Sequence, residues 1–230
     1  MDFQQGEILL FDKELDWTSF DLVKKVRNKL TRFTGEKKLK VGHAGTLDPK
    51  ATGLMILCTG KATKQIESLQ AEEKEYVATI KLGATTPSFD LETEEDTVFP
   101  TGHITRELIG EVFQKFTGEQ LQVPPIFSAV KIDGKRAYEH ARKGNDVKLN
   151  AKLIAIHELE LLEFLPDQIT VRVRCSKGTY IRALARDMGE ALHSGAYLTG
   201  LRRTKIGAFD VKDALTIEFF LNNLEQIVTN

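Results

Sequence analysis

The stretch from Val41 to Leu54 most constrains how this chain can fold, because it holds three glycines, a proline and several small residues around one carboxylate, Asp48. Glycine permits positive φ angles and lets another segment of backbone approach closely. Pro49 holds Asp48 in an extended or turn conformation, away from the helical region. The stretch therefore predicts a tight loop that presents Asp48, with an ordinary Asp-Pro surface turn as the simpler alternative.

Length and composition are those of a globular protein: 230 residues, 41% hydrophobic and 28% charged. No linker-like segment interrupts the sequence, so we expect one domain over residues 1–230. The longest apolar run, Leu54 to Cys58, is far shorter than a membrane helix requires. The N-terminus lacks the pattern of a secretion signal, and two cysteines cannot build a disulfide framework. Cys58 and Cys175 are expected to be buried thiols of a cytoplasmic protein that has no membrane partner.

The net charge of −1, from 32 basic and 33 acidic residues, conceals a segregated distribution. Residues 24–50 hold nine basic and two acidic side chains, residues 131–152 hold seven and three, and residues 172–186 hold five basic and no acidic ones. Such segments can present a positive face to a polyanion such as nucleic acid, or they can be ordinary solvated helix faces.

Apolar periodicity predicts both helices and strands. Helical spacing is found over residues 18–30, 105–118, 137–143 and 181–192, and strand alternation over residues 76–82, 153–164 and 169–175. The last two strands flank Pro166-Asp167 and are expected to pair antiparallel. This order of elements favours an α+β fold with a largely antiparallel sheet.

A second candidate site lies at the strand-to-helix junction from Cys175 to Arg182. Thr179 is expected to cap the helix. The helix N-terminus attracts anions, so the Arg182 guanidinium would lie near a carboxylate or phosphate. An arginine on a solvated helix face is the alternative. His43 precedes Asp48, but no second histidine or cysteine stands at ligand spacing, so no metal site is expected. The sequence also lacks a phosphate-binding glycine loop, which predicts no nucleotide cofactor.

The stretch 42–54, Gly-His-Ala-Gly-Thr-Leu-Asp-Pro followed by Ala-Thr-Gly-Leu, resembles the catalytic-loop motif of the TruB family of tRNA pseudouridine synthases. Four more segments resemble motifs of that family in the same order: Asp12-Lys13 with Thr18–Asp21, Pro124–Lys131 with Gly134 and Ala137-Tyr138, Lys177–Arg182, and Leu198–Phe209. Five collinear motifs are not expected by chance. Glu14 and Asp16 stand where the family motif usually has proline and glycine. These two differences bear on the conformation of the local turn and on one contact with substrate.

The resemblance implies the pseudouridine synthase fold: α+β, with a long, mostly antiparallel mixed central sheet, flanking helices and an active-site cleft across the sheet. It implies isomerisation of uridine-55 in the T arm of tRNA to pseudouridine, after the base has been flipped out of its stack. We expect a cytoplasmic monomer that binds the tRNA T stem-loop and uses no cofactor. The C-terminal RNA-binding PUA domain of many family members is expected to be absent.

By the same resemblance Asp48 is the catalytic residue, acting either as a covalent nucleophile or as a base at C2′. Arg182 would pair with Asp48, and Tyr76 would stack on the flipped base. The residues expected to bind substrate are Lys13, His43, Lys64, Tyr180 and Leu201. Two alternatives remain: a non-catalytic tRNA-binding or tRNA-folding module of the same fold, and a carboxylate-dependent hydrolase, although glycosidases generally need two carboxylates.

Overall fold

A computed structural model of the chain describes residues 1–128, 131–132, 135–137 and 149–229. The chain forms two compact units: unit 1 comprises Met1–Tyr76 and Leu201–Asn230, and unit 2 comprises Val77–Gly200. Both boundaries fall inside strands, β4 (Lys74–Leu82) and β12 (Ala196–Ile206), which therefore contribute to each unit. The assignment of both units to a single catalytic domain stays a prediction.

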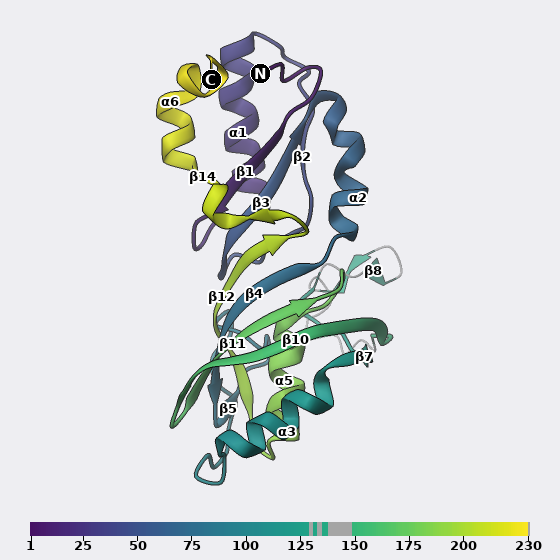
Figure 1. Cartoon of the computed structure of the whole chain (residues 1–230), viewed down its shortest axis with the longest axis vertical. Helices are drawn as coiled ribbons and strands as arrows, with labels where there is room; N and C mark the ends of the chain where they lie inside the picture. The colour runs from purple at the N-terminus through teal and green to yellow at the C-terminus, as the bar shows by residue number, and fades with distance from the viewer. Residues whose placement is uncertain (129–130, 133–134, 138–148, 230) are drawn as a thin grey trace. The chain divides into compact units, whose positions relative to one another are not determined.

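Unit 1 is built on the strand order β14-β1-β3-β12 (Figure 1). β1 pairs antiparallel with β3 and parallel with β14, and β3 pairs parallel with β12. The remaining short strands pair antiparallel with β3 and β12. The elements are β1 (Ile8–Lys13), α1 (Ser19–Thr34), β2 (Val41–His43), β3 (Ala51–Thr59), the 3-10 helix η1 (Gly60–Gln65), α2 (Ile66–Ala71), β13 (Phe209–Asp210), the 3-10 helix η2 (Val211–Asp213), β14 (Leu215–Thr216) and α6 (Ile217–Thr229).

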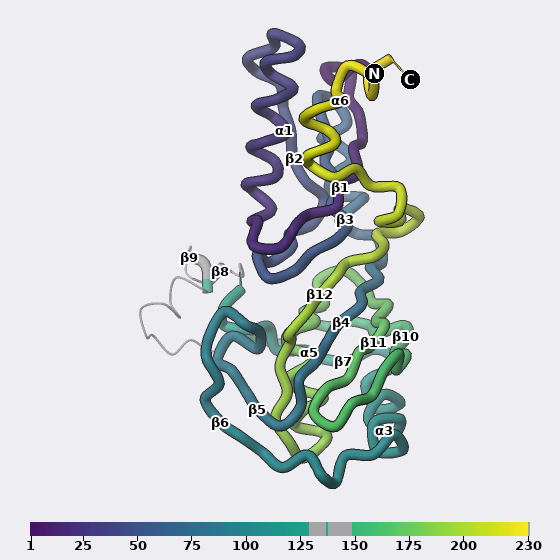
Figure 2. Tube along the Cα trace, turned by 90° about the vertical axis from the view of Figure 1, so that its left-hand side faces the viewer, coloured from purple at the N-terminus to yellow at the C-terminus, as the bar shows by residue number. Residues whose placement is uncertain are grey.

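Strand β3 forms the centre of this unit, because its apolar run is buried on both faces. Helix α1 packs its predicted apolar face into the same core and contacts α6 (Figure 2). Thr18 caps α1 in a capping box with Asp21. The helix runs one turn beyond the expected end at Leu30 and stops where Gly35 takes the left-handed conformation, φ 72°.

Unit 2 continues the sheet in the order β12-β4-β11-β10-β7. Its long hairpin, β10 with β11, is antiparallel, and β7 pairs antiparallel with β10. Helices α3 and α5 contact each other in this unit. The elements are β5 (Ala84–Thr85), β6 (Thr97–Val98), α3 (Arg106–Phe116), β7 (Gly118–Gln122), β8 (Lys131–Ile132), β9 (Lys135–Arg136), β10 (Lys152–Leu165), β11 (Gln168–Cys175) and α5 (Ile181–Ala191).

The predicted α+β class with a large, mostly antiparallel sheet is confirmed, as are the expected strands and the helices that became α1, α3 and α5. Cys58 and Cys175 are both buried, as expected. The helix expected over residues 137–143 lies, after Ala137, outside the described residues, as does most of the basic segment 131–152. None of the helices in the described part of the chain has the length and apolar character needed to cross a membrane.

Candidate active site

The loop that carries Asp48 joins β2 to β3 in unit 1, and its backbone is bound on the N-terminal side of Asp48 by Ser19. The Ser19 hydroxyl donates to the Leu47 carbonyl at 2.9 Å and accepts the Leu47 N–H at 2.8 Å. Ser19 is only 4% exposed, so both hydrogen bonds are protected from water. Leu47, the residue immediately before Asp48, is therefore held through both its backbone N–H and its backbone carbonyl.

Arg203, from β12, binds the two flanks of the same loop. Its Nε donates to the Leu54 carbonyl at 2.8 Å, and its two terminal nitrogens donate to the carbonyls of Gly45 at 3.1 Å and Thr46 at 3.4 Å. The side chain is 1% exposed. The backbone of Arg203 in turn lies against Gly53, where any β-carbon would sit 2.2 Å from the Arg203 carbonyl oxygen. The glycine spacing of this motif thus serves a close approach of two strands.

Asp16 binds the loop on the other side of Asp48. Its N–H donates to the Pro49 carbonyl at 2.9 Å, and its carboxylate accepts from Lys50 at 2.7 Å. Asp16 stands where the related motif has glycine, and its backbone has φ 64°. Aspartate tolerates this left-handed conformation better than most residues, so the turn survives the substitution and adds an ion pair.

Lys13 and His43 provide further polar groups in unit 1. Lys13 is 1% exposed, and its Nζ donates to the carbonyls of Glu14 at 2.9 Å and Trp17 at 2.7 Å. Burial lowers its pKa to about 8, against the opposing effect of the Asp48 charge. Burial also lowers the pKa of His43, against the opposing effect of a hydrogen bond with the Gly45 backbone, and the Arg203 charge adds to the lowering. The hydrogen bonds of Lys13 to backbone show a structural role, and its contact with substrate stays a prediction.

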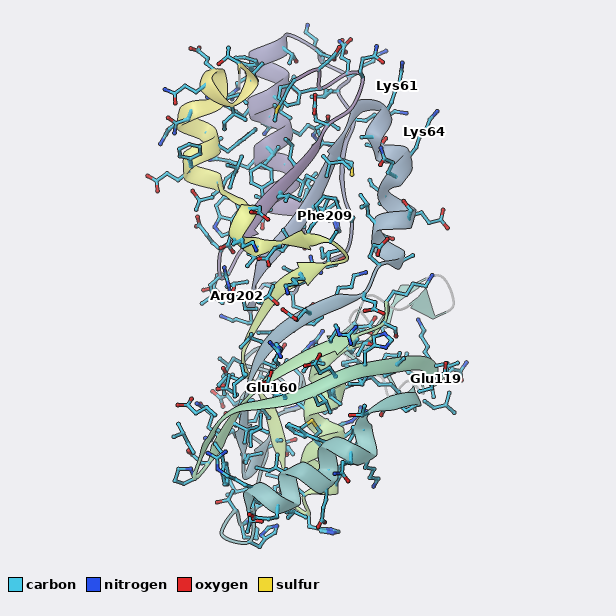
Figure 3. The ribbon with its side chains drawn as sticks, in the orientation of Figure 1. Lys61, Lys64, Glu119, Glu160, Arg202 and Phe209 are labelled. Atoms are coloured by element: carbon cyan, nitrogen blue, oxygen red, sulfur yellow. The ribbon has the colours of Figure 1, made fainter. Side chains whose placement is uncertain are left out.

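The other expected substrate-binding residues of unit 1 occupy different surroundings. Lys64 is exposed near the end of η1, and Figure 3 shows its side chain pointing away from the ribbon beside that of Lys61. Tyr76 is 8% exposed on the buried face of β4. Leu201 is half-buried in β12, opposite Ala51 of β3.

Arg182 lies in unit 2, in the first turn of α5, and is 4% exposed. Its Nε is 3.5 Å from the Asp90 carboxylate, and its terminal nitrogens donate to the carbonyls of Ser88 at 3.2 Å and Phe127 at 2.9 Å. The alternative of an arginine on a solvated helix face is wrong. Asp90 is also buried, and the Arg182 guanidinium balances its charge.

Tyr180, and not the expected Thr179, is the N-cap of α5. The Thr179 hydroxyl instead donates to the Ser176 carbonyl at 3.0 Å, and so closes the preceding turn. The Tyr180 N–H is taken by the side-chain oxygen of Gln122 at 2.8 Å. Gln122 of β7 thus binds the backbone of the N-cap residue, a contact that periodicity and capping preference alone do not reveal.

The structure thus groups Lys13, His43 and Asp48 in unit 1 and groups Tyr180 with Arg182 in unit 2. Sequence reasoning missed the residues that hold these groups, namely Ser19, Asp90, Gln122 and Arg203. Ser19 and Arg203 occur inside quoted motifs, which was a usable signal. Asp90 lies in an acidic segment, and Gln122 lies two positions before Pro124. Neither residue has a local sequence pattern that marks its role.

Two family models match consecutive parts of this chain. Residues 29–181 match the model of the TruB family pseudouridylate synthase N-terminal domain, and residues 182–228 match the tRNA pseudouridylate synthase B C-terminal domain. The chain is 62% identical to tRNA pseudouridine synthase B of Phocaeicola vulgatus, covering 98% of this chain and 96% of that protein. It is 61% identical to tRNA pseudouridine synthase B of Parabacteroides distasonis, with 99% and 97% covered.

Among solved structures, a chain in the crystal structure of a Cbf5-Nop10-Gar1 complex is similar with a TM-score of 0.73 and 29% identity, covering 96% of this chain and 55% of that chain. A chain in the structure of an H/ACA RNP bound to a substrate RNA containing 2′-deoxyuridine has a TM-score of 0.68 and 25% identity, covering 99% and 56%. This chain therefore spans little more than half the length of those two proteins. With consecutive family models and near-full-length relatives above 60% identity, the chain belongs to the TruB family of pseudouridylate synthases.

Proposed function

We propose that this chain is a tRNA pseudouridine synthase that isomerises uridine-55 in the T stem-loop, acts as a monomer and uses Asp48 as its catalytic group. The observation that carries the proposal is the binding of the Asp48 loop. Leu47 and Pro49 are each hydrogen-bonded to another segment, and Arg203 binds the loop's flanks. A loop whose backbone is held on both sides of Asp48 keeps the carboxylate pre-organised for a reaction at a bound nucleotide.

The reaction needs one ionised carboxylate and no consumed cofactor. The N1–C1′ bond of the uridine is cleaved, the uracil turns, and C5 is joined to C1′. C5 then loses its hydrogen as a proton and N1 gains a proton, so the reaction is an isomerisation. Asp48 starts this sequence either by covalent attack or by removing the C2′ proton. Tyr76 is proposed to stack on the flipped base, and Tyr180 and Leu201 are each proposed to bind substrate. His43 is proposed to contact the RNA loop, Lys13 to bind substrate, and Lys64 to bind phosphate.

The direct test is to incubate the protein with an unmodified tRNA transcript and to map pseudouridine by carbodiimide treatment and primer extension. A stop assigned to position 55 is the expected result. Release of free uracil would instead indicate a hydrolase, and tight binding without any modification would indicate a non-catalytic module. Modification at another uridine would overturn the position while retaining the chemistry.

Asp48→Asn tests the catalytic assignment. We expect no tritium release from [5-³H]uridine tRNA in single-turnover assays, with tRNA affinity within about threefold of wild type because the loop contacts are to backbone. Asp213→Asn, which changes an exposed carboxylate of the same unit, is the matched control and should leave the rate unchanged. An unimpaired rate for Asp48→Asn would show that another group performs the chemistry.

A further inference from the structure

The side-chain amide of Gln122 forms two hydrogen bonds with the backbone of a single residue, Tyr180. Its Nε2 donates to the Tyr180 carbonyl at 3.1 Å, and its Oε1 accepts the Tyr180 N–H at 2.8 Å. Gln122 is 3% exposed, so its side-chain amide is largely shielded from water. Gln122 ends β7 opposite Lys152 of β10, and its side chain extends the hydrogen bonding of the sheet edge to the start of α5.

Two further contacts follow from the residues after Gln122. The Val123 carbonyl accepts from Arg186 at 3.1 Å, and the Phe127 carbonyl accepts from Arg182 at 2.9 Å. Arg182 and Arg186 are one helical turn apart and share a face of α5. The segment from Gln122 to Phe127, which includes the Pro-Pro motif, therefore lies along the first turns of the helix that carries Arg182.

We propose that Gln122 is a positioning residue for the reaction, holding the backbone that carries Tyr180 and Arg182 in its catalytic arrangement. This inference rests on the proposed function. The amide is required because it offers one donor and one acceptor side by side. A carboxylate at this position would accept the N–H but would face the Tyr180 carbonyl with a second negative oxygen. A protonated carboxyl group would restore the donor.

The substitution Gln122→Glu therefore tests this role in a single variant, because a change of pH alone removes or restores the donor. Burial and the facing carbonyl raise the pKa of the introduced carboxyl group above the ordinary glutamate value of about 4.3. We expect the single-turnover rate at saturating tRNA, relative to wild type, to fall at least about tenfold near pH 8 and to recover to within about threefold near pH 5.5. The tRNA affinity should change little at either pH, because the effect is on positioning.

Gln114→Glu makes the same chemical change at an exposed position of α3 in the same unit and serves as the control, with the same rate relative to wild type at both pH values. If the relative rate of Gln122→Glu is equal at both pH values, the inference is overturned, whether the variant is fully active or uniformly impaired. A loss confined to tRNA affinity also overturns it. If wild type itself fails to form pseudouridine, the proposed function fails first, and the two failures are thereby distinguished.

Discussion

Arg203 has its guanidinium inside unit 1, where it donates to the carbonyls of Gly45 and Thr46 in the Asp48 loop and of Leu54 in β3. Lysine keeps the charge but cannot reach three carbonyls with a planar fork. We expect Arg203→Lys to lower the free energy of unfolding by about 2–4 kcal/mol and to reduce turnover. Urea denaturation monitored by circular dichroism measures the first effect.

The neighbouring Arg202→Lys is the matched control. The Arg202 side chain is 41% exposed and forms an ion pair with Asp12. Its replacement should therefore lower the free energy of unfolding by less than about 1 kcal/mol. Equal losses in the two variants would show that the burial of Arg203 contributes nothing specific to the loop.

Lys13 predicts a pH dependence of stability. Its pKa falls from 10.5 in the unfolded chain to about 8 in the folded one. Above pH 8 the folded state has released a proton that the unfolded state still binds, so this lysine makes stability rise with pH up to about 10.5. The neutral amine still has two hydrogens for the Glu14 and Trp17 carbonyls.

We therefore expect the stability of wild type relative to Lys13→Met to increase by on the order of 2–3 kcal/mol between pH 7 and pH 10, since each pKa unit corresponds to about 1.4 kcal/mol. The two proteins are compared by urea denaturation at each pH, which cancels the titration of their shared groups. Parallel curves would contradict the lowered pKa of Lys13.

At the scale of elements, the parallel pairing of β3 with β12 depends on a glycine. Gly53 has φ 104°, and an added β-carbon would meet the Arg203 backbone at 2.2 Å. We expect Gly53→Ala to destabilise the protein by more than about 3 kcal/mol. Alanine is strained at this positive φ, and its β-carbon would clash with the Arg203 backbone. The melting temperature from calorimetry is the measurement.

Gly110→Ala provides the opposite outcome for the same chemical change. Gly110 lies in α3, and nothing stands within 4 Å of an added β-carbon. Alanine should stabilise this helix by about 0.5–1 kcal/mol. Similar destabilisation in both variants would indicate that the close approach at Gly53 has no special cost.

At the scale of the whole molecule, the net charge of −1 predicts no attraction to RNA, so binding must come from local basic segments. Lys37 and Lys38 are both exposed just after α1. Reversing both charges should reduce the slope of log K against log salt by about 2, as two phosphate contacts are lost. The single-turnover rate at saturating tRNA should stay nearly unchanged, since such contacts position the RNA.

Binding measured at several salt concentrations decides this, with the pair Lys37→Arg and Lys38→Arg as the control that keeps the charges. A slope identical to wild type in the reversed variant would show that the tRNA does not contact this segment.

The elements that sequence reasoning predicted well are those with a local pattern. The face of α1, the alternation of β4 and the β10–β11 hairpin each follow from residues that are close in sequence. The parallel pairings of β1 with β14 and of β3 with β12 were not predicted. They join segments from opposite ends of the chain, and no local periodicity specifies which distant strand will be the neighbour.

Local patterns along the chain are enough to indicate its kind of chemistry: one carboxylate in a glycine-bracketed loop, an arginine at a helix start, and five motifs in a family's order. What holds these groups in place becomes visible in the folded chain alone. Ser19 binds Leu47, Arg203 binds the loop's flanks, and Gln122 binds Tyr180. Each of these hydrogen bonds involves a buried side chain and joins segments far apart in sequence. Such bonds form only when the sheet brings the segments together and excludes water, which no short stretch of residues encodes.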